Sequence, residues 1–498
     1  MKLRAALAFA VMLGLTACSI VAPATDPGPE AAAHAVSSPQ MQAGRYAWSS
    51  SDRARLRGLL QSSLASHWFE RAGVAIADAS GNILYGRNPR RAYAPASTLK
   101  TIVAATALAT LGANAHLDTA LAALDRPDAT GRVHDLWLIG GGDPVLDQSQ
   151  LHDGVAALFR EGVRRVDGDV IVDPRSFTEP EQNRAWASDD FEYGYAAGTS
   201  PISLNWNVIE FKVAPTRIGA PARVTVFPAD PDIVIHGTPT TGYATTLTID
   251  REKPGSNAFV ISGTISNLGE QSFYRPVAGI PLWAAQVVAQ MLRDQGIVVD
   301  GNARLGTDAL ALQTLWQHRS PALQTMIHQM LFESDNHIAE QLLRVLGTAG
   351  GDGVVHAGGS ESAGARTERA YLQSVDVPMP GLRIVDGSGL AESDRIAPIT
   401  LVRLLQAAAQ ASTAHAYVSA FPLVGIEGTV RHHELGSALG RVRAKSGHID
   451  GVNALVGYVD TRKHGRLAFA FLVNEPYADD AISIQIGIDR ALDGLASM

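Results

Sequence analysis

The sequence contains a single cysteine, few aromatic residues and few charged ones. Cys18 has no partner for an internal disulfide, and the lack of further cysteines argues against a cysteine-ligated zinc site. Charged residues make up 18% of the 498 positions, and a net charge of -8 without a basic tract gives no reason to expect nucleic-acid binding. The apolar content of 46% is instead typical of a globular protein, here long enough for two or three domains.

Several catalytic and binding motifs are also missing. There is no G-x-S-x-G sequence, which argues against an α/β-hydrolase. His432, His433 and Glu434 do not have the H-E-x-x-H spacing of a zinc peptidase. The glycines at 140–142 are not followed by the Gly-Lys-Ser/Thr of a phosphate-binding loop, so they predict a turn. We therefore expect neither a metal nor a cofactor.

The first apolar run is too short to span a bilayer. Lys2 and Arg4 precede the apolar residues 5–15, whereas a membrane-spanning helix takes about 20 residues, so the run predicts a secretory signal. The residues that end at Cys18 resemble the lipobox of bacterial lipoproteins. The resemblance implies a lipoprotein signal peptide at 1–18 and lipidation of Cys18. A stray cysteine in an ordinary signal peptide is the alternative.

The segment after the cysteine is rich in Ala, Pro, Ser and Gly, which predicts a flexible tether at 19–50. The several acyl chains of a lipoprotein would hold such a tether firmly to a membrane. Ser19 resembles the residue that sorts lipoproteins to the outer membrane of Gram-negative bacteria. We therefore expect a periplasmic protein, anchored through Cys18, that faces the cell wall.

The body of the chain is predicted to consist of helices and antiparallel strands, separated by a β-rich stretch. The first elements expected are a helix at 53–64, a hairpin at 73–85 and a nearly all-apolar helix at 97–111. Helices are expected again at 282–293, 322–346, 398–411 and 480–495, and strands at 440–446, 452–460 and 467–473.

We therefore predict an α+β fold with an interrupted domain. Helices on an antiparallel sheet form one domain from 51–115 and 296–498. Short β-rich runs broken by Gly, Pro and Asp fill 116–295, which we interpret as an insertion that forms one or two extra domains.

Three short motifs occur in a fixed order along the chain. They are S-x-x-K at Ser97 and Lys100, S-x-N at Ser334 and Asn336, and K-S-G at 445–447. Each alone is weak evidence, but the ordered set is typical of an active-site serine acyl-transferase.

The first motif supplies a nucleophile and its base. A helix start would place the Ser97 hydroxyl and the Lys100 amine on one face. Serine becomes a good nucleophile only when a base accepts its proton. Lysine can be that base if burial or a second cation, here Lys445, lowers its pKa from about 10.4. Taken alone, the motif could equally be a helix-capping serine with a surface lysine.

The second motif supplies polar groups opposite the nucleophile. Ser334 can relay a proton to the leaving group, and Asn336 can hold both a substrate amide and Lys100. Asp335 is expected to point away. A simple helix cap is compatible with the same residues.

The third motif supplies a strand that can bind the substrate carboxylate. Alternation along a strand sends Lys445 and Gly447 to one side, where Lys445 and the Ser446 hydroxyl can hold a substrate carboxylate. Gly447 allows close approach of the substrate backbone. The backbone N–H groups of His448 and Ser97 would form an oxyanion hole. The alternative is an edge-strand lysine near a turn.

With these motifs, four further stretches make the chain resemble the class C low-molecular-mass penicillin-binding proteins, which are D-alanyl-D-alanine carboxypeptidases/endopeptidases of the penicillin-binding protein 4 type. The stretches are 142–144, 195–205, 386–390 and 425–431. The resemblance implies a transpeptidase/β-lactamase-like domain interrupted by inserted domains. It also implies that D-Ala–D-Ala or D-Ala–diaminopimelate bonds of peptidoglycan stem peptides are cleaved through an acyl-enzyme, with β-lactams as covalent inhibitors.

The same resemblance implies a role for one further residue, and the chain departs from the family pattern at two positions. Asp190 corresponds to an acidic residue that receives the diaminopimelate ammonium; Asp189 is a rival, and a solvated acidic loop is the alternative. His448 stands where the family has Thr or Ser, and Glu392 stands near a position that often holds arginine. Because Glu392 would repel a carboxylate, the two departures bear on substrate choice.

Two other functions remain open. A β-lactamase or esterase on the same scaffold needs a water-activating base, and the chain has neither an E-x-x-L-N nor a Y-x-N sequence. A non-catalytic, peptidoglycan-binding envelope lipoprotein would carry a silent site. The intact set of Ser97, Lys100, Ser334, Asn336 and Lys445 favours the peptidase.

Overall fold

The computed structural model describes residues 47–178, 180–230, 232–307, 311–349, 358–474 and 480–498. Cys18, the signal peptide expected at 1–18 and most of the expected tether lie outside the described residues. Ser49 caps the first helix, so the last residues assigned to the tether already belong to the folded body. Within the described ranges, no helix is long and apolar enough to cross a membrane.

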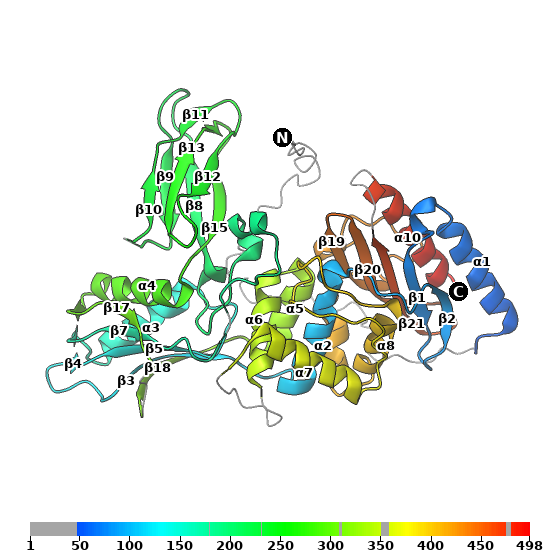
Figure 1. Ribbon diagram of the computed structural model, residues 1–498, viewed down its shortest axis with the longest axis horizontal. Helices are drawn as coiled ribbons and strands as arrows, with labels where there is room; N and C mark the ends of the chain where they lie inside the picture. Colours follow the sequence, from blue (N-terminus) through cyan, green and yellow to red (C-terminus); the bar gives the residue numbers. More distant parts are fainter. Residues whose placement is uncertain (1–46, 179, 231, 308–310, 350–357, 475–479) are drawn as a thin grey trace, which may run out of the picture.

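A five-stranded antiparallel sheet, on the right in Figure 1, organises the first domain. The strands follow the order β19-β20-β21-β1-β2, so the two ends of the chain build one sheet. Their bounds are β1 Gly73–Ala77, β2 Ile83–Arg87, β19 Val442–Ile449, β20 Val452–Asp460 and β21 Arg466–Asn474.

Helices cover both faces of this sheet. The bounds are α1 Ser50–Ser63 and α10 Ala481–Ala496 on one face, and α2 Lys100–Leu111, α5 Leu323–Glu333, α6 Asn336–Thr348, α7 Glu361–Ser374, α8 Pro398–Ala408 and α9 Ala414–Ser419 on the other. In β21, Phe469 and Phe471 pack towards α1 and α10, whereas Ala468 and Ala470 pack towards α2 and α8. Small side chains on the second face let the buried helix α2 approach the sheet closely.

The inserted part begins with a mixed sheet of order β17-β7-β5-β3-β18, covered by two helices. The bounds are β3 Asp118–Ala123, β5 Leu136–Gly140, β7 Val170–Val172, β17 Ala303–Leu305, β18 Gln313–Arg319, α3 Gln148–Arg160 and α4 Ile280–Asp294. A small parallel sheet, β4 Arg132–Val133, β6 Arg165–Val166 and β16 Val298–Val299, lies beside it.

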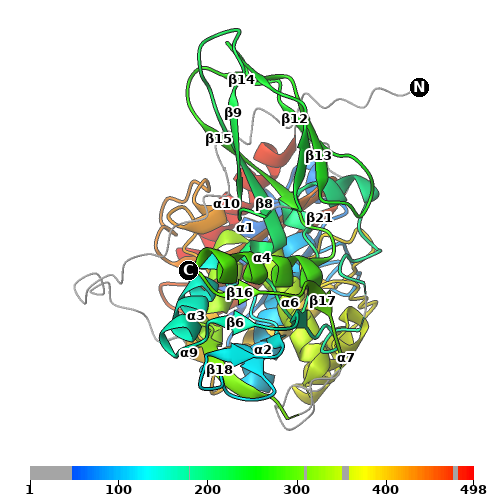
Figure 2. The ribbon, with the colours of Figure 1, turned by 90° about the vertical axis from the view of Figure 1, so that its left-hand side faces the viewer.

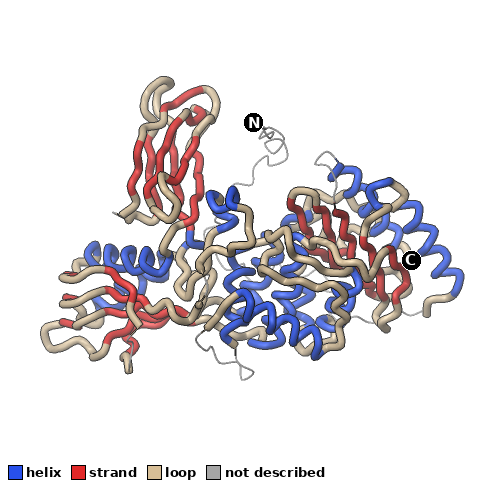
Figure 3. Tube along the Cα trace, in the orientation of Figure 1, coloured by secondary structure: helices blue, strands red, loops and turns tan. Residues whose placement is uncertain are grey.

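A narrow β unit projects from this sheet, as the upper left of Figure 1 and the turned view of Figure 2 show. Its bounds are β8 Val208–Ala214, β9 Arg223–Phe227, β10 Val234–His236, β11 Thr240–Gly242, β12 Thr248–Arg251, β13 Ala258–Ser262, β14 Thr264–Ser266 and β15 Gln271–Pro276. Figure 3 shows that this unit is almost entirely strand and loop.

The chain enters and leaves the insertion at one neck. Leu117 N donates to Ser320 Oγ at 2.9 Å, and Ser320 N donates to the Leu117 carbonyl at 3.1 Å. Leu323 N donates to the Ala115 carbonyl at 2.8 Å. The two crossings therefore lie side by side.

Strand pairing extends the inserted unit beyond the expected limit at 295. Strands β16, β17 and β18 pair with β6, β7 and β3, which favours an insertion that ends near Arg319. Strands of two or three residues are too short to show alternation, so they cannot be predicted from their own residues. The insertion also contains α3, which was not expected although Asp147 and Gln150 form a capping box at its start.

One expected helix is two helices. The stretch 322–346 breaks at Ser334, which has a left-handed backbone with φ of 62°, and Asp335 then caps α6 by accepting a hydrogen bond from Ile338 N. Apolar periodicity continues across the break, which is why the pattern alone predicted one helix.

Candidate active site

Ser97 and Lys100 lie on consecutive turns of one buried element. Residues Ala96–Leu99 form a 3-10 turn, η2, that runs directly into α2. The Thr98 hydroxyl donates to the Pro95 carbonyl at 2.7 Å, which fixes the start of the turn. Ser97 is half-buried and Lys100 is 0% exposed, so the hydroxyl can be reached from outside while the amine cannot.

The Lys100 amine contacts three acceptors from three elements. Its Nζ donates to Ser97 Oγ at 2.8 Å, to Asn336 Oδ1 at 2.8 Å and to the Ser388 carbonyl at 2.9 Å. The three donors of an ammonium are thereby all used. Two of the sequence-predicted motifs thus meet at one nitrogen, within hydrogen-bond reach of a serine hydroxyl.

Burial lowers the pKa of Lys100 to about 8, against the opposing effect of the Asp386, Glu340 and Asp335 carboxylates. An amine with this pKa is neutral in about a tenth of molecules at pH 7. The neutral form can accept the proton of Ser97, so the environment supplies the condition that a lysine base requires.

The corner between α5 and α6 holds the second motif. The Asp335 carboxylate accepts from Ile338 N and from Trp206 Nε1 and so points away from the lysine, while Asn336 Nδ2 donates to the Tyr195 carbonyl at 3.0 Å. Among the described residues, Ser334 Oγ has no hydrogen-bond partner. The Asn336 side chain is therefore hydrogen-bonded to Lys100. Ser334 lies two residues before it in the same corner, but its hydroxyl makes no hydrogen bond to Lys100.

The third motif lies on β19, next to η2. A Cβ at Gly447 would lie 2.7 Å from the Pro95 carbonyl oxygen and 3.1 Å from Thr98 N, so only glycine fits against this turn. Ser446 points to the other side, where its Oγ lies 2.9 Å from Thr429 Oγ1.

Lys445 is fully buried near the first lysine. Within the part of the chain that the structure describes, its Nζ donates only to the Ser446 carbonyl, at 2.6 Å. Burial, together with the charge of Lys100, lowers the pKa of Lys445 well below its usual range. Such a lysine lacks a counter-ion, which an anionic ligand could supply.

The remaining expected residues lie at the edges of this cluster. Asp190 Oδ1 accepts from the Tyr195 hydroxyl at 2.7 Å, and its rival Asp189 is exposed beside Ser188. His448 is exposed and its Nδ1 lies 3.1 Å from Asn453 Oδ1. Glu392 is also exposed.

A loop at 385–394 also belongs to the site; the sequence predicted a family resemblance at 386–390 and an effect of Glu392 on substrate choice, but no contact with Lys100. The Asp386 carboxylate accepts from Gly389 N at 2.6 Å and from Ala391 N at 2.7 Å. Glu340 accepts from Gly387 N at 3.1 Å and from Ser388 N at 2.8 Å. These carboxylates hold the backbone so that the Ser388 carbonyl faces Lys100. The only sequence signal was the D-G-S-G-L stretch itself.

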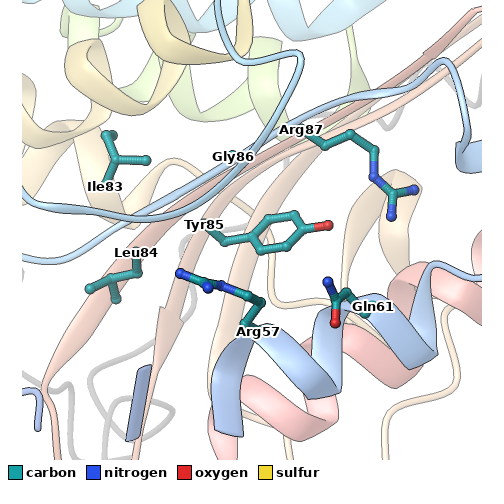
Figure 4. A pocket seen from close by; sticks show the side chains of 7 residues that line it. All are labelled: Arg57, Gln61, Ile83, Leu84, Tyr85, Gly86 and Arg87. Carbon is teal, nitrogen blue, oxygen red and sulfur yellow. The ribbon is translucent and has the colours of Figure 1, made fainter. Parts of the chain in front are cut away.

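A pocket of about 520 Å³ lies far from this cluster, between α1 and β2. Figure 4 shows its polar lining, which includes Arg57, Gln61, Tyr85 and Arg87. Because β2 and β19 are opposite edges of the sheet, this pocket is separate from the candidate site.

Comparison with known proteins agrees with the motif set. Residues 59–495 match the D-Ala-D-Ala carboxypeptidase 3 (S13) family. A D-alanyl-D-alanine carboxypeptidase from Actinomadura sp. (strain R39) is 31% identical over 439 residues, which cover 84% of this chain and 80% of that protein.

Solved structures show the same fold. Penicillin binding protein 4 (dacB) from Haemophilus influenzae matches with a TM-score of 0.75 at 22% identity, over 87% of this chain and 97% of that one. A second structure of that protein, with a TM-score of 0.70 and the same identity and coverage, is complexed with a β-lactam. A predatory peptidoglycan endopeptidase from Bdellovibrio bacteriovorus matches with a TM-score of 0.50 at 16% identity, over 85% of this chain and 92% of that one.

Proposed function

Because this chain belongs to the S13 family and is a serine-type D-Ala-D-Ala carboxypeptidase, we propose that Ser97 is its nucleophile and that Lys100 is the base. The observation that carries the proposal is the Lys100 amine, which lies 2.8 Å from both Ser97 Oγ and Asn336 Oδ1. Among the described residues, no other serine hydroxyl is hydrogen-bonded to a lysine side chain.

We propose the following reaction, which the Lys100 contacts support. Neutral Lys100 accepts the Ser97 proton while Oγ bonds to the carbonyl carbon of the penultimate D-Ala. The backbone N–H groups of Ser97 and His448 stabilise the negative charge on the carbonyl oxygen. As the C–N bond breaks, Ser334 Oγ passes a proton to the leaving amine and is reprotonated from Lys100. Water then hydrolyses the ester and restores the Ser97 hydroxyl.

The substrate carboxylate binds at the third motif. Lys445 is a buried amine whose charged form a substrate carboxylate would stabilise, and Ser446 adds a hydroxyl at the adjacent position on β19. Gly447 keeps the strand close to η2, so the carboxylate and the scissile carbonyl are held at a fixed separation.

The substrate is a peptidoglycan stem peptide that ends in D-Ala–D-Ala or contains a D-Ala–diaminopimelate cross-link. Asp190 receives the diaminopimelate ammonium, because its carboxylate lies beside Tyr195, whose carbonyl accepts from Asn336. Glu392 disfavours substrates with an additional free carboxylate nearby. Product masses from defined peptidoglycan fragments distinguish the two cleavages.

β-Lactams acylate the same serine and inhibit the enzyme. Intact-mass analysis after incubation with penicillin should show a single adduct on the wild type and none on Ser97→Ala. An adduct that survives Ser97→Ala would contradict the assignment. Rapid release of hydrolysed nitrocefin would instead indicate a β-lactamase, and D-Ala release unaffected by Ser97→Ala would exclude this nucleophile.

A cell-wall peptidase family implies an extracytoplasmic location. We extend this to a periplasmic enzyme held by a lipid on Cys18, with the outer membrane as the destination set by Ser19. Metabolic labelling with a palmitate analogue tests the anchor. The label should appear on the full chain and be absent from Cys18→Ser.

A further inference from the structure

Two of the three acceptors around Lys100 lie at or next to irregular backbone. Asn336 is the first residue of α6, with the cap Asp335 between it and the left-handed corner at Ser334, and Ser388 belongs to the loop at 385–394. Neither position is fixed by a strand or by the interior of a helix. Their geometry must therefore be set by side-chain contacts.

An indole holds the first of these positions. Trp206 Nε1 donates to Asp335 Oδ2 at 2.7 Å, while the other carboxylate oxygen caps α6. Trp206 itself is held between Asn205 and Asn207, and all three residues have left-handed backbones with φ of 48°, 56° and 55°. The Asn207 side chain donates to the Gly198 carbonyl at 2.9 Å and accepts from Leu204 N at 3.0 Å, which stabilises this unusual turn.

A second indole holds the other position. Trp186 Nε1 donates to Asp386 Oδ2 at 2.9 Å. The same carboxylate accepts from Gly389 N and Ala391 N. The Trp186 indole therefore holds Asp386, and Asp386 in turn holds the backbone of the loop. Trp186 and Asp386 are both buried.

Both tryptophans come from the inserted part of the chain, whereas both aspartates belong to the catalytic domain. The same inserted stretch contacts α6 further along, because His337 Nε2 lies 2.6 Å from Ser203 Oγ and Gln341 Oε1 accepts from Ser200 N at 3.0 Å. The insertion therefore reaches both loops that face Lys100.

We propose that Trp186 and Trp206 are positioning residues for Lys100, which act by holding Asp386 and Asp335 and thereby the Ser388 carbonyl and the Asn336 amide. This rests on the proposed function of Ser97 and Lys100. It gives the insertion a part in catalysis that does not require it to touch the substrate.

Penicillin acylation tests the proposal. Trp186→Phe and Trp206→Phe keep an aromatic ring and remove only the N–H donor. Each should lower the acylation rate constant at saturating penicillin about tenfold, the value of one hydrogen bond to a charged group. The double variant should lose about a hundredfold, because the two pairs hold different acceptors. The penicillin concentration for half-maximal rate should change less than about twofold, since among the described residues neither indole N–H is hydrogen-bonded to Lys445 or Ser446.

Trp283→Phe is the matched control. Trp283 is buried in α4 of the insertion and, within the described residues, its Nε1 has no hydrogen-bond partner, so its loss should leave acylation unchanged. If Trp206→Phe does not fold, as judged by thermal unfolding, Asp335→Asn weakens the same contact from the other side. Because it also removes a carboxylate that raises the pKa of Lys100, its loss of acylation rate is measured at pH 9, where Lys100 is mostly neutral in both proteins.

The outcomes are distinct. Unchanged rates in both tryptophan variants, an equal loss in Trp283→Phe, or a loss confined to the half-saturating concentration would each overturn the positioning role while leaving Ser97 as the nucleophile. A wild-type chain that forms no adduct would overturn the proposed function and this inference together.

Discussion

The sheet of the catalytic domain and the sheets of the projecting β unit are both largely antiparallel, yet they are buried very differently. Strands β20 and β21 are buried along almost their whole length, because helices cover both faces. Strand β9 alternates between exposed and half-buried residues, and no residue of β15 before Pro276 is fully buried. One sheet forms the core of a thick domain, and the other is a thin projection.

The difference explains where the chemistry can be placed. Lowering the pKa of a lysine to about 8 by burial requires closely packed groups around it, which the covered sheet and its helices provide. The thin unit also buries charges, since burial lowers the pKa of Arg251 and Arg275, but it carries none of the three motifs. What the insertion contributes is directional contact, through indole N–H groups, at the point where it meets the catalytic domain.

The largest expected effect separates the two regions by activity. Ser97→Ala should lower D-Ala release by about 10^4-fold or more, because no other group can form the ester. Ser256→Ala, at a half-buried serine in a turn of the β unit, should leave it unchanged. Release assays on a stem pentapeptide measure both, and equal activities of the two variants would remove the distinction.

The next largest expected difference between the catalytic sheet and the β unit is in the stability lost on mutation. Phe471→Ala in β21 should reduce the free energy of unfolding by about 3–5 kcal/mol, since it opens a cavity in a fully buried site. Val226→Ala in half-buried β9 should cost about 1 kcal/mol. Urea unfolding gives both values. Similar losses would show that the β unit is packed as tightly as the catalytic domain.

The pH dependence tests the dehydrated lysine directly. Only neutral Lys100 can accept the Ser97 proton, and its pKa is lowered to about 8. Acylation should therefore rise about tenfold per pH unit below pH 8 and level off above it. Lys212→Ala, which removes a partly exposed lysine of β8, should not move this profile. A flat profile between pH 6 and 9 would argue against Lys100 as the base.

The smallest expected effect concerns the edge of the site. Asp190→Asn should raise KM several-fold for peptides with a free diaminopimelate ammonium, because an exposed ion pair contributes at most about 1 kcal/mol. Peptides that carry lysine with an acetylated side chain serve as the control and should be unaffected. An equal change in kcat for both peptides would place Asp190 in the chemistry instead.

Much of the catalytic domain could be predicted because its signals are local. The hairpin at β1 and β2, the apolar helix α2 and strand β20 follow from periodicity in short windows, and S-x-x-K places two groups one turn apart. Asn336 was also predicted to hold Lys100, from its residue type and the motif set. The Ser388 carbonyl could not be, because a backbone acceptor leaves no mark in the side-chain sequence.

The two tryptophan contacts could not be predicted from the sequence either. Trp206 and Asp335 lie far apart in the chain, and an indole surrounded by asparagines predicts no partner. Strands β16 and β17 were not predicted for a related reason. Two or three residues are too few to show a periodic apolar pattern, so these strands are recognised only by their pairing with β6 and β7.

The neck at Leu117 and Ser320 has a consequence for how such a chain can change. Since the two crossings are hydrogen-bonded neighbours, a short linker could rejoin them and the intervening residues could be excised without disturbing the topology of the catalytic sheet. Excision would nevertheless remove Trp186 and Trp206 together with the Tyr195 carbonyl. A lineage could therefore exchange or trim the outer β unit freely, but it could discard the stretch at 186–206 only after evolving another means of holding the two loops beside the lysine.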